Sequence, residues 1–294
     1  MGGTRKDGQR AVETALIHHG YVPPAGFAAV QPTVHKASTV IFPNTQALLA
    51  RQWKDKTGYT YGLHGTPTTF TLEARLAEIE GGTDCLLAPS GLAAIAMVDL
   101  ALLKAGDDFL IPDNVYNPNR ELANWLQKDF GISARYYDPM VGEGIGELIR
   151  PETKLVWTEA PGSVSMEVPD IPAICRAAKA KGVPVALDNT WAAGLAFRAF
   201  DHGVDIVMQA LTKYHSGGSD VLMGAVITRD KDLLRKLEMA HMRLGMGVSA
   251  DDTYLVLRGL PTMKLRFDAH DAAARKIAGW LKAQPEIAKV PHPA

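Results

Sequence analysis

The sequence predicts an α/β fold, in which a mostly parallel sheet carries helices on both of its faces. Short runs of apolar residues recur between residues 85 and 228, and segments with helical spacing separate them. Strands that are apolar throughout, rather than on alternate residues, are typical of parallel sheets whose two faces are both covered. Turn residues bound the runs, as Pro89-Ser90-Gly91 does after the first. The predicted strands cover residues 85–88, 108–111, 134–137, 154–159, 183–188, 205–208 and 225–228, the last as an edge or antiparallel strand.

Helical periodicity marks the segments between the strands. Leu72, Leu76 and Ile79 have the spacing of one helix face, and Gly81-Gly82 is a typical helix end. A long amphipathic helix begins after Pro261. The predicted helices cover residues 12–18, 71–80, 92–104, 119–130, 171–181 and 262–283.

The chain divides into three predicted parts. Residues 1–61 form an arm without lasting periodicity, punctuated by several prolines. A long segment without a core of its own usually lies on another surface, which we expect to be that of a neighbouring subunit. Residues 62–258 form the α/β domain, and residues 259–294 begin a C-terminal domain.

Composition limits the classes of function. The chain has 294 residues, 47% of them apolar and 21% charged, with a net charge of −1. This balance argues against a nucleic-acid or anionic-membrane partner held by a basic face. The two cysteines are too few for a disulfide framework or a cysteine-built metal site, and no His/Cys cluster has metal spacing, so we expect no metal. Without a signal-peptide core or a membrane-length apolar run, the chain is predicted to be cytoplasmic.

Polar residues follow the predicted strands at the edge where parallel sheets bind ligands. Ser90-Gly91 begins a helix and offers backbone N–H groups to a phosphate. Tyr116 could stack on a planar ring, and Asp188 could hold a protonated ring nitrogen. Lys213, beside the hydroxyl of Thr212, offers an amine for a Schiff base. Phosphate, aromatic ring, ring nitrogen and aldehyde together describe pyridoxal phosphate.

Each of these residues also has a purely structural interpretation. Lys213 fits a lysine at a solvent-exposed strand end, and Ser90 fits a plain helix cap. Asp188 fits a residue that caps a turn, and Tyr116 fits a packed aromatic side chain. Neither a P-loop nor a strand-coupled G-x-G-x-x-G is present as another phosphate-binding device.

The chain resembles the cysteine/methionine-metabolism family of pyridoxal-phosphate enzymes from about Thr14 to its last residue. The most specific segments are residues 59–68 (YTYGLHGTPT), 160–168 (APGSVSMEV), 187–194 (LDNTWAAG) and 212–214 (TKY). The D-N-T-W-A-A-G and P-G-S forms are similar to the β-lyase branch, since γ-synthases and γ-lyases have D-N-T-[FY] and P-T-N-P there.

The resemblance implies a fold of the aspartate-aminotransferase type (fold type I) and a role for each candidate residue. Lys213 would form the internal aldimine, Asp188 would pair with the pyridine nitrogen, and Tyr116 would stack on the ring and assist proton movement. Tyr61 would reach the phosphate of the neighbouring subunit. The remaining cofactor contacts implied are Gly91, Leu92 and Thr212 at the phosphate, Ser163 near the ring hydroxyl, and Thr190 beside Asp188.

The implied reaction is β-elimination of L-cystathionine to homocysteine, pyruvate and ammonia, a transsulfuration step of methionine biosynthesis, in a homotetramer. Three alternatives stay open. The chain could be a broader cysteine-S-conjugate β-lyase, a γ-lyase or γ-synthase, or an inactive module that binds cofactor or a partner.

The sequence departs from the family pattern in four places. Leu63 stands where an arginine is usual, Ala210 where many relatives have a phosphate-binding serine, and Gly218 where a histidine is usual. The first two remove contacts worth about 1.5–3 and 0.5–1.5 kcal/mol. We also expect most of a C-terminal domain of roughly 100 residues to be missing, with the arginine that grips the substrate carboxylate. Part of the apolar face of helix 262–283 should therefore be exposed or covered by another subunit.

Overall fold

The computed structural model describes residues 10–18, 20–23 and 25–292. The chain forms two compact units, the first from residues up to 101 together with 209–261, the second from residues 102–208 together with 262–294. The boundaries of these two compact units differ from those of the three predicted parts. The arm, the α/β domain and the C-terminal part remain predictions. Among the described residues no helix is long and apolar enough to cross a membrane.

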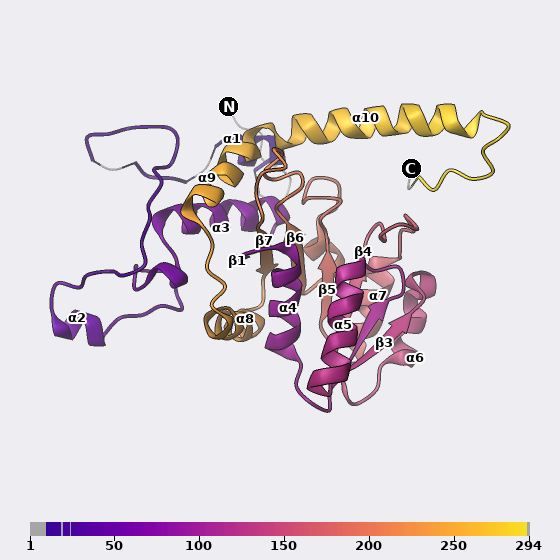
Figure 1. Cartoon of the computed structure of the whole chain (residues 1–294), viewed down its shortest axis with the longest axis horizontal. Coiled ribbons are helices and arrows are strands. Elements are labelled where there is room, and N and C mark those ends of the chain that lie inside the picture. The colour runs from indigo at the N-terminus through magenta and orange to yellow at the C-terminus, as the bar shows by residue number, and fades with distance from the viewer. Residues whose placement is uncertain (1–9, 19, 24, 293–294) are drawn as a thin grey trace. The chain divides into compact units, whose positions relative to one another are not determined.

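A parallel sheet forms the centre of the second unit (Figure 1). Its strands follow the order β6-β5-β4-β2-β3, and all neighbours run parallel. Every residue of β2 and β5 is buried, as expected for strands that are covered on both faces. The strands are β2 (Asp108–Pro112), β3 (Ser133–Tyr137), β4 (Thr153–Glu159), β5 (Val185–Asp188) and β6 (Ile206–Ala210), which enters the first unit at Gln209.

The helices of this unit begin and end at recognisable sequence signals. Asp170 caps α7 (Ile171–Ala180) by accepting from the Ala173 amide at 3.0 Å, and α7 contacts β5. A proline in its first turn starts α5 (Asn117–Phe130), Gly131 ends it at a φ of 66°, and it contacts β3. Shorter helical segments are η2 (Pro139–Gly144), α6 (Ile145–Leu148) and η3 (Ala199–His202).

The first unit is built on an antiparallel pair of strands, β1 (Asp84–Ala88) and β7 (Gly224–Thr228). This confirms the antiparallel arrangement expected of the last strand. Both α3 (Pro67–Glu80) and α8 (Lys231–Leu244) contact the two strands. The other helices of this unit are α1 (Val12–Ile17), α4 (Gly91–Leu102), α9 (Ala250–Gly259) and η4 (Leu260–Thr262).

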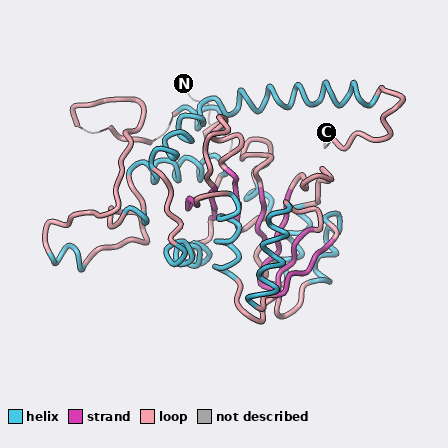
Figure 2. The backbone as a smooth tube through the Cα atoms, viewed as in Figure 1, coloured by secondary structure: helices cyan, strands magenta, loops and turns pink. Residues whose placement is uncertain are grey.

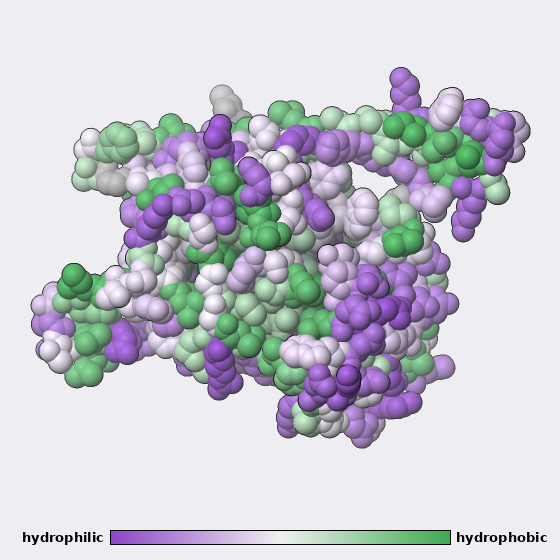
Figure 3. All heavy atoms as spheres, viewed as in Figure 1, coloured by the Kyte–Doolittle hydropathy of each residue, from purple (hydrophilic) through white to green (hydrophobic). Residues whose placement is uncertain are grey.

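The arm that precedes α3 is mostly loop (Figure 2). It contains α2 (Thr45–Leu49) and η1 (Gly62–His64). Thr39 and Tyr61 form an isolated antiparallel bridge, and a Cβ at Gly62 would collide with the Ala37 carbonyl. Two parts of the arm are therefore held against each other by close backbone contact. Hydrophobic side chains gather over the α2 segment at the left of Figure 3, where Ile41 and Leu49 are exposed.

The last helix, α10 (Met263–Lys282), lies within the predicted range and shows the exposed apolar face that was expected. Leu265 is 71% exposed, Ile277 57% and Trp280 62%. Figure 3 shows hydrophobic and charged side chains mixed along this helix, at the upper right.

All seven predicted strands are present, with ends that differ by one or two residues. Helix α3 begins four residues before the predicted Thr71, because Thr66 and Thr69 form a capping box and Pro67 occupies the first turn. Four α-helices of the described residues, α2, α6, α8 and α9, were not predicted. Both cysteines, Cys85 and Cys175, are buried as expected.

Candidate active site

Two carboxylates lie at the carboxyl edge of the sheet in the second unit. Glu159 is the last residue of β4 and Asp188 the last residue of β5, and the parallel register pairs them directly. Their side chains are almost fully enclosed, because Glu159 is only 3% exposed and Asp188 8%. Burying two acidic groups side by side costs free energy, and such pairs are typical of binding or catalytic sites.

Glu159 connects two loops that carry predicted site residues. The Ser163 hydroxyl donates to Oε1 of Glu159 at 2.5 Å, and the Tyr116 backbone amide donates to Oε2 at 2.8 Å. Both oxygens of one carboxylate are thus used, each by a different loop. The second unit thereby brings Tyr116 and Ser163 to the same group.

Burial, reinforced by the negative charge of Asp188, raises the pKa of Glu159 to about 7. The hydrogen bonds from Ser163 and Tyr116 oppose this rise, because they stabilise the ionised form. Glu159 therefore has an acid strength suited to holding or releasing a proton near neutral pH.

Asp188 and Thr190 form a tight turn after β5. The Thr190 amide donates to Oδ1 of Asp188 at 3.0 Å, as in the predicted turn-capping interpretation. The carboxylate is buried and sits at the strand end, which suits a role in holding a protonated ring nitrogen.

Tyr116 occupies the N-cap position of α5, and its side chain is 45% exposed. Nearly half of Tyr116 is open and the rest is covered, so the packed and the stacking interpretations both stay predictions. An exposed aromatic ring is a suitable platform for a planar ligand.

The sequence predicted Lys213 at a strand end, but β6 ends three residues earlier, at Ala210. It sits in a turn after β6, where its carbonyl accepts from the Gly217 amide at 3.0 Å, and its side chain is exposed. The exposed position matches the structural interpretation of this lysine, and it leaves the amine accessible. Thr212 precedes it in the same turn and is half-buried.

The start of α4 provides the candidate phosphate contacts. Ser90 caps the helix, since its hydroxyl accepts from the Ala93 amide at 3.0 Å, which confirms the capping interpretation. The first N–H groups of a helix have no partner within it, so the amides of Gly91 and Leu92 suit an anion. Leu92 is 37% exposed.

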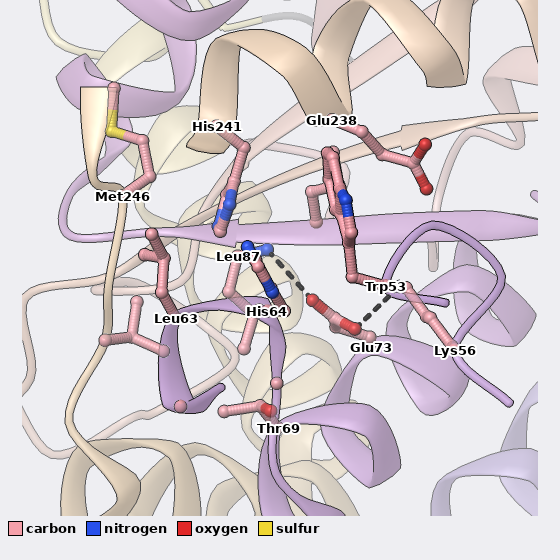
Figure 4. Close-up of a pocket in the computed structure, with 14 residues that line it drawn as sticks. Trp53, Lys56, Leu63, His64, Thr69, Glu73, Leu87, Glu238, His241 and Met246 are labelled. Carbon is pink, nitrogen blue, oxygen red and sulfur yellow. Dashed lines mark hydrogen bonds and ion pairs between the residues drawn. The ribbon is translucent and has the colours of Figure 1, made fainter. Parts of the chain in front are cut away.

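A separate pocket of about 30 Å³ lies within the first unit (Figure 4). Its walls combine apolar side chains with a buried ion pair, in which Nζ of Lys56 lies 2.6 Å from Oε2 of Glu73. Leu63, the residue that replaces the family's arginine, is among the lining residues with Met246 and His241. Burial lowers the pKa of His241 to about 4, so this imidazole is neutral.

Tyr61 belongs to the arm and is 46% exposed. Its ring makes a T-shaped contact with that of His64, with centroids 5.9 Å apart. Because nearly half of Tyr61 is exposed, the residue is accessible, and its contact with a neighbouring subunit remains a prediction.

Sequence reasoning missed Glu159 as a site residue, although its segment was noted among the strand ends. The available signal was an acidic residue ending an apolar strand, next to a second strand that also ends in an acid. The Lys56–Glu73 pair was missed as well, because Lys56 lies in the arm without periodicity. The described residues contain no group of three or more metal-ligating side chains.

Known proteins resemble nearly the whole chain. The family described as "Cys/Met metabolism PLP-dependent enzyme" matches residues 13–294. A putative cystathionine beta-lyase of Rhizobium johnstonii is 44% identical over 96% of this chain and 70% of that protein. The cystathionine beta-lyase of Haemophilus influenzae is 37% identical over 96% of this chain and 72% of its own length.

Solved structures confirm the predicted fold class. Cystathionine gamma-lyase of Lactobacillus plantarum, complexed with L-serine, has 31% sequence identity and a TM-score of 0.87. That match covers 95% of this chain and 71% of the other.

Proposed function

Because this chain belongs to the Cys/Met metabolism family of pyridoxal-phosphate-dependent enzymes, we propose that it cleaves L-cystathionine by β-elimination. The products would be homocysteine, pyruvate and ammonia. The observation that carries the proposal is the 44% and 37% identity to proteins named cystathionine beta-lyases, each over 96% of the chain. We also propose that the enzyme works as a cytoplasmic homotetramer, which native mass spectrometry would test.

The residues of each unit fit the cofactor chemically. The second unit offers a buried carboxylate, Asp188, for a protonated ring nitrogen and the open ring of Tyr116 for stacking. The first unit offers the helix start at Gly91 for the phosphate and the exposed amine of Lys213. The other proposed cofactor contacts are Leu92, Thr212, Tyr61, Thr190 and Ser163.

Bound pyridoxal phosphate supplies an aldehyde for the lysine amine and a sink for the electrons released at the substrate's Cα. With that cofactor bound, the amine of Lys213 would take up the proton of the substrate's Cα. The carboxylate of Asp188 would hold the ring nitrogen in its protonated form. The phenol of Tyr116 would assist proton movement as the thiolate on Cβ departs.

A γ-lyase is the second candidate, because the Lactobacillus plantarum structure of that name superposes with a TM-score of 0.87. The P-G-S form at residues 161–163 favours the β-lyase instead. The two reactions differ in their keto-acid product, which is pyruvate for β-elimination and 2-oxobutyrate for γ-elimination. A β-lyase that accepts cysteine S-conjugates would also release pyruvate, and the substrate range separates it.

The test combines a binding and a product measurement. The purified chain is reconstituted with pyridoxal phosphate, reduced with borohydride and digested, and the peptide that carries the cofactor is identified by mass spectrometry. We expect the label on Lys213 and pyruvate release from L-cystathionine. The Lys213→Ala variant should lose the label and at least about a hundredfold of the activity.

Other outcomes would contradict parts of the proposal. If 2-oxobutyrate is the main product, the β-lyase assignment is wrong. If the chain stays colourless with added cofactor, it is an inactive module and both enzyme assignments fail.

A further inference from the structure

The side chains of Glu159 and Ser163 share a short hydrogen bond, with Oε1 and Oγ 2.5 Å apart. The other carboxylate oxygen, Oε2, accepts from the Tyr116 amide at 2.8 Å, and Glu159 is only 3% exposed. The amide proton stays on its nitrogen, so Oε2 is the acceptor of that bond in every state. The direction of the bond to Ser163, by contrast, depends on whether Glu159 carries a proton.

The two protonation states of Glu159 leave Ser163 with opposite hydrogen-bonding abilities. An ionised carboxylate only accepts, so it takes the single hydroxyl proton of Ser163, whose oxygen then has only lone pairs left for other neighbours. A protonated Glu159 instead donates through Oε1, and the hydroxyl proton of Ser163 is released for a second acceptor. The proton on Glu159 therefore decides whether Ser163 can donate a hydrogen bond to a ligand.

The surroundings of Glu159 favour its protonated form. Asp188, its partner on the neighbouring strand, carries a negative charge that disfavours a second one beside it. Burial acts in the same direction, and only the hydrogen bonds from Ser163 and Tyr116 oppose it, so that the pKa of Glu159 rises to about 7. Near neutral pH, Glu159 can hold a proton with little free-energy penalty.

The cofactor of the proposed function needs a donor from Ser163. Since its ring nitrogen is given to Asp188, the polar ring group left for Ser163 is the ring oxygen, which accepts hydrogen bonds. We propose that Glu159 is a positioning residue that keeps its proton in the holoenzyme, donates it to the Ser163 hydroxyl and so makes that hydroxyl a donor toward the ring oxygen. The inference rests on the proposed function, because it requires pyridoxal phosphate at this edge.

The substitution Glu159→Gln separates the proton from the other contacts of this side chain. The oxygen of the new amide can accept from the Tyr116 amide as Oε2 does, and its NH₂ group donates to Ser163 as the protonated acid would. Both loops stay attached, and the direction of the bond to Ser163 no longer depends on pH. The other variants are Ser163→Ala and the combination of the two. The matched control is Glu147→Gln, the same change at an exposed position on α6.

Titration of the purified chain with pyridoxal phosphate gives the dissociation constant at pH 6.0 and 8.5, on either side of the pKa of Glu159. Proteins are compared at the same pH, because pH effects on the cofactor itself are common to all of them. We expect the wild type and Glu159→Gln to bind equally at pH 6.0. At pH 8.5 the wild type should bind about tenfold more weakly than Glu159→Gln, the effect of one lost hydrogen bond.

The remaining variants show whether the hydroxyl transmits this effect. Ser163→Ala should bind about tenfold more weakly than the wild type at pH 6.0, where the hydroxyl donates, and equally at pH 8.5, where it does not. In the Ser163→Ala background, Glu159→Gln should change the affinity by the same factor at both pH values. Glu147→Gln should match the wild type throughout.

Two results would overturn the inference. A ratio of wild-type to Glu159→Gln affinity that does not change with pH would mean that the proton on Glu159 has no part in binding. A change with pH that persists in the Ser163→Ala background would mean that the charge acts on the cofactor without the hydroxyl.

Far-UV circular dichroism checks the folding of each variant. If Glu159→Gln does not fold, the comparison of Ser163→Ala with the wild type decides alone, and an equal loss of affinity at both pH values would overturn the inference. A wild type that binds no pyridoxal phosphate at either pH refutes the proposed function itself, which is distinct from a wild type that binds the cofactor with a pH-independent ratio.

Discussion

Nζ of Lys56, a residue of the arm, lies 2.6 Å from Oε2 of Glu73, which is on α3. The same ammonium donates to the Cys85 carbonyl at 2.6 Å, and the Leu87 amide donates to the other carboxylate oxygen at 3.4 Å. Burial opposes the charge on Lys56, but the carboxylate of Glu73 outweighs burial and raises the pKa of Lys56. Within the first unit, the arm is therefore fastened to α3 by an ion pair that is mostly shielded from water.

Lys56→Met should lower the free energy of unfolding by about 3 kcal/mol, because it leaves the buried Glu73 carboxylate without its partner charge. The double variant Lys56→Met/Glu73→Leu should recover most of that loss. Urea denaturation measures both. The control is Lys264→Met, which breaks the exposed Lys264–Asp268 pair and should cost less than about 1 kcal/mol. Equal losses of unfolding free energy in Lys56→Met and Lys264→Met would show that the Lys56–Glu73 pair is no stronger than an exposed one.

Acid should weaken the first unit through His241. Its folded pKa of about 4 lies below the ordinary value of 6.5, so the unfolded chain takes up the proton first as the pH falls. The contribution of neutral His241 to the free energy of unfolding is complete above pH 6.5 and declines toward pH 4, by on the order of 3 kcal/mol. His241→Gln should remove this part of the decline in urea midpoints measured between pH 7.5 and 4.5. His270→Gln, an exposed change on α10, should leave the decline as it is.

Glu159 should lower the stability of the fold as the pH rises, which is the opposite of the effect of His241. Its folded pKa of about 7 lies above the ordinary 4.5, so the folded state keeps the proton longer as the pH rises. The stabilisation is complete below pH 4.5 and is lost through pH 7, by on the order of 2–3 kcal/mol. Glu159→Gln should remove this loss, so that the variant and the wild type differ in the slope of stability against pH. Parallel slopes would mean that Glu159 titrates normally.

Gly224 leaves no room for a side chain. A Cβ there would collide with the backbone carbonyl of Ser90, which starts α4. Gly224→Ala should therefore cost about 1–3 kcal/mol of stability and weaken pyridoxal phosphate binding, because the helix start must move. Gly279→Ala, in α10 with no atom within 4 Å of the added Cβ, should instead stabilise by about 0.5–1 kcal/mol. Thermal denaturation and cofactor titration measure both variants.

The sheet was predictable because its strands are apolar on both faces and end in turn residues, a pattern that local sequence contains. Helices α8 and α9 carry many charged residues on their open sides, and α2 has only five residues, so their periodicity was easy to overlook. The start of α3 lies in a polar stretch, where a capping box and not apolar spacing begins the helix.

The site was predictable only in part, for a physical reason. Asp188, Tyr116 and Ser163 could be collected at one edge because parallel strands end there. That Glu159 accepts from two of those loops depends on how the loops fold back, and no local pattern encodes that. Lys213 was misplaced onto a strand end, since β6 stops at Ala210 and the chain turns before the lysine.

The burial of the cysteines has a consequence for the proposed chemistry. Burial raises the pKa of Cys85 well above its usual value and that of Cys175 to about 12, so neither forms a thiolate near neutral pH. The chain has no other cysteine. The proposed reaction would release homocysteine, a reactive thiol that also forms disulfides. Because both cysteine thiols are buried and protonated near neutral pH, we expect their exchange with such disulfides to be slow.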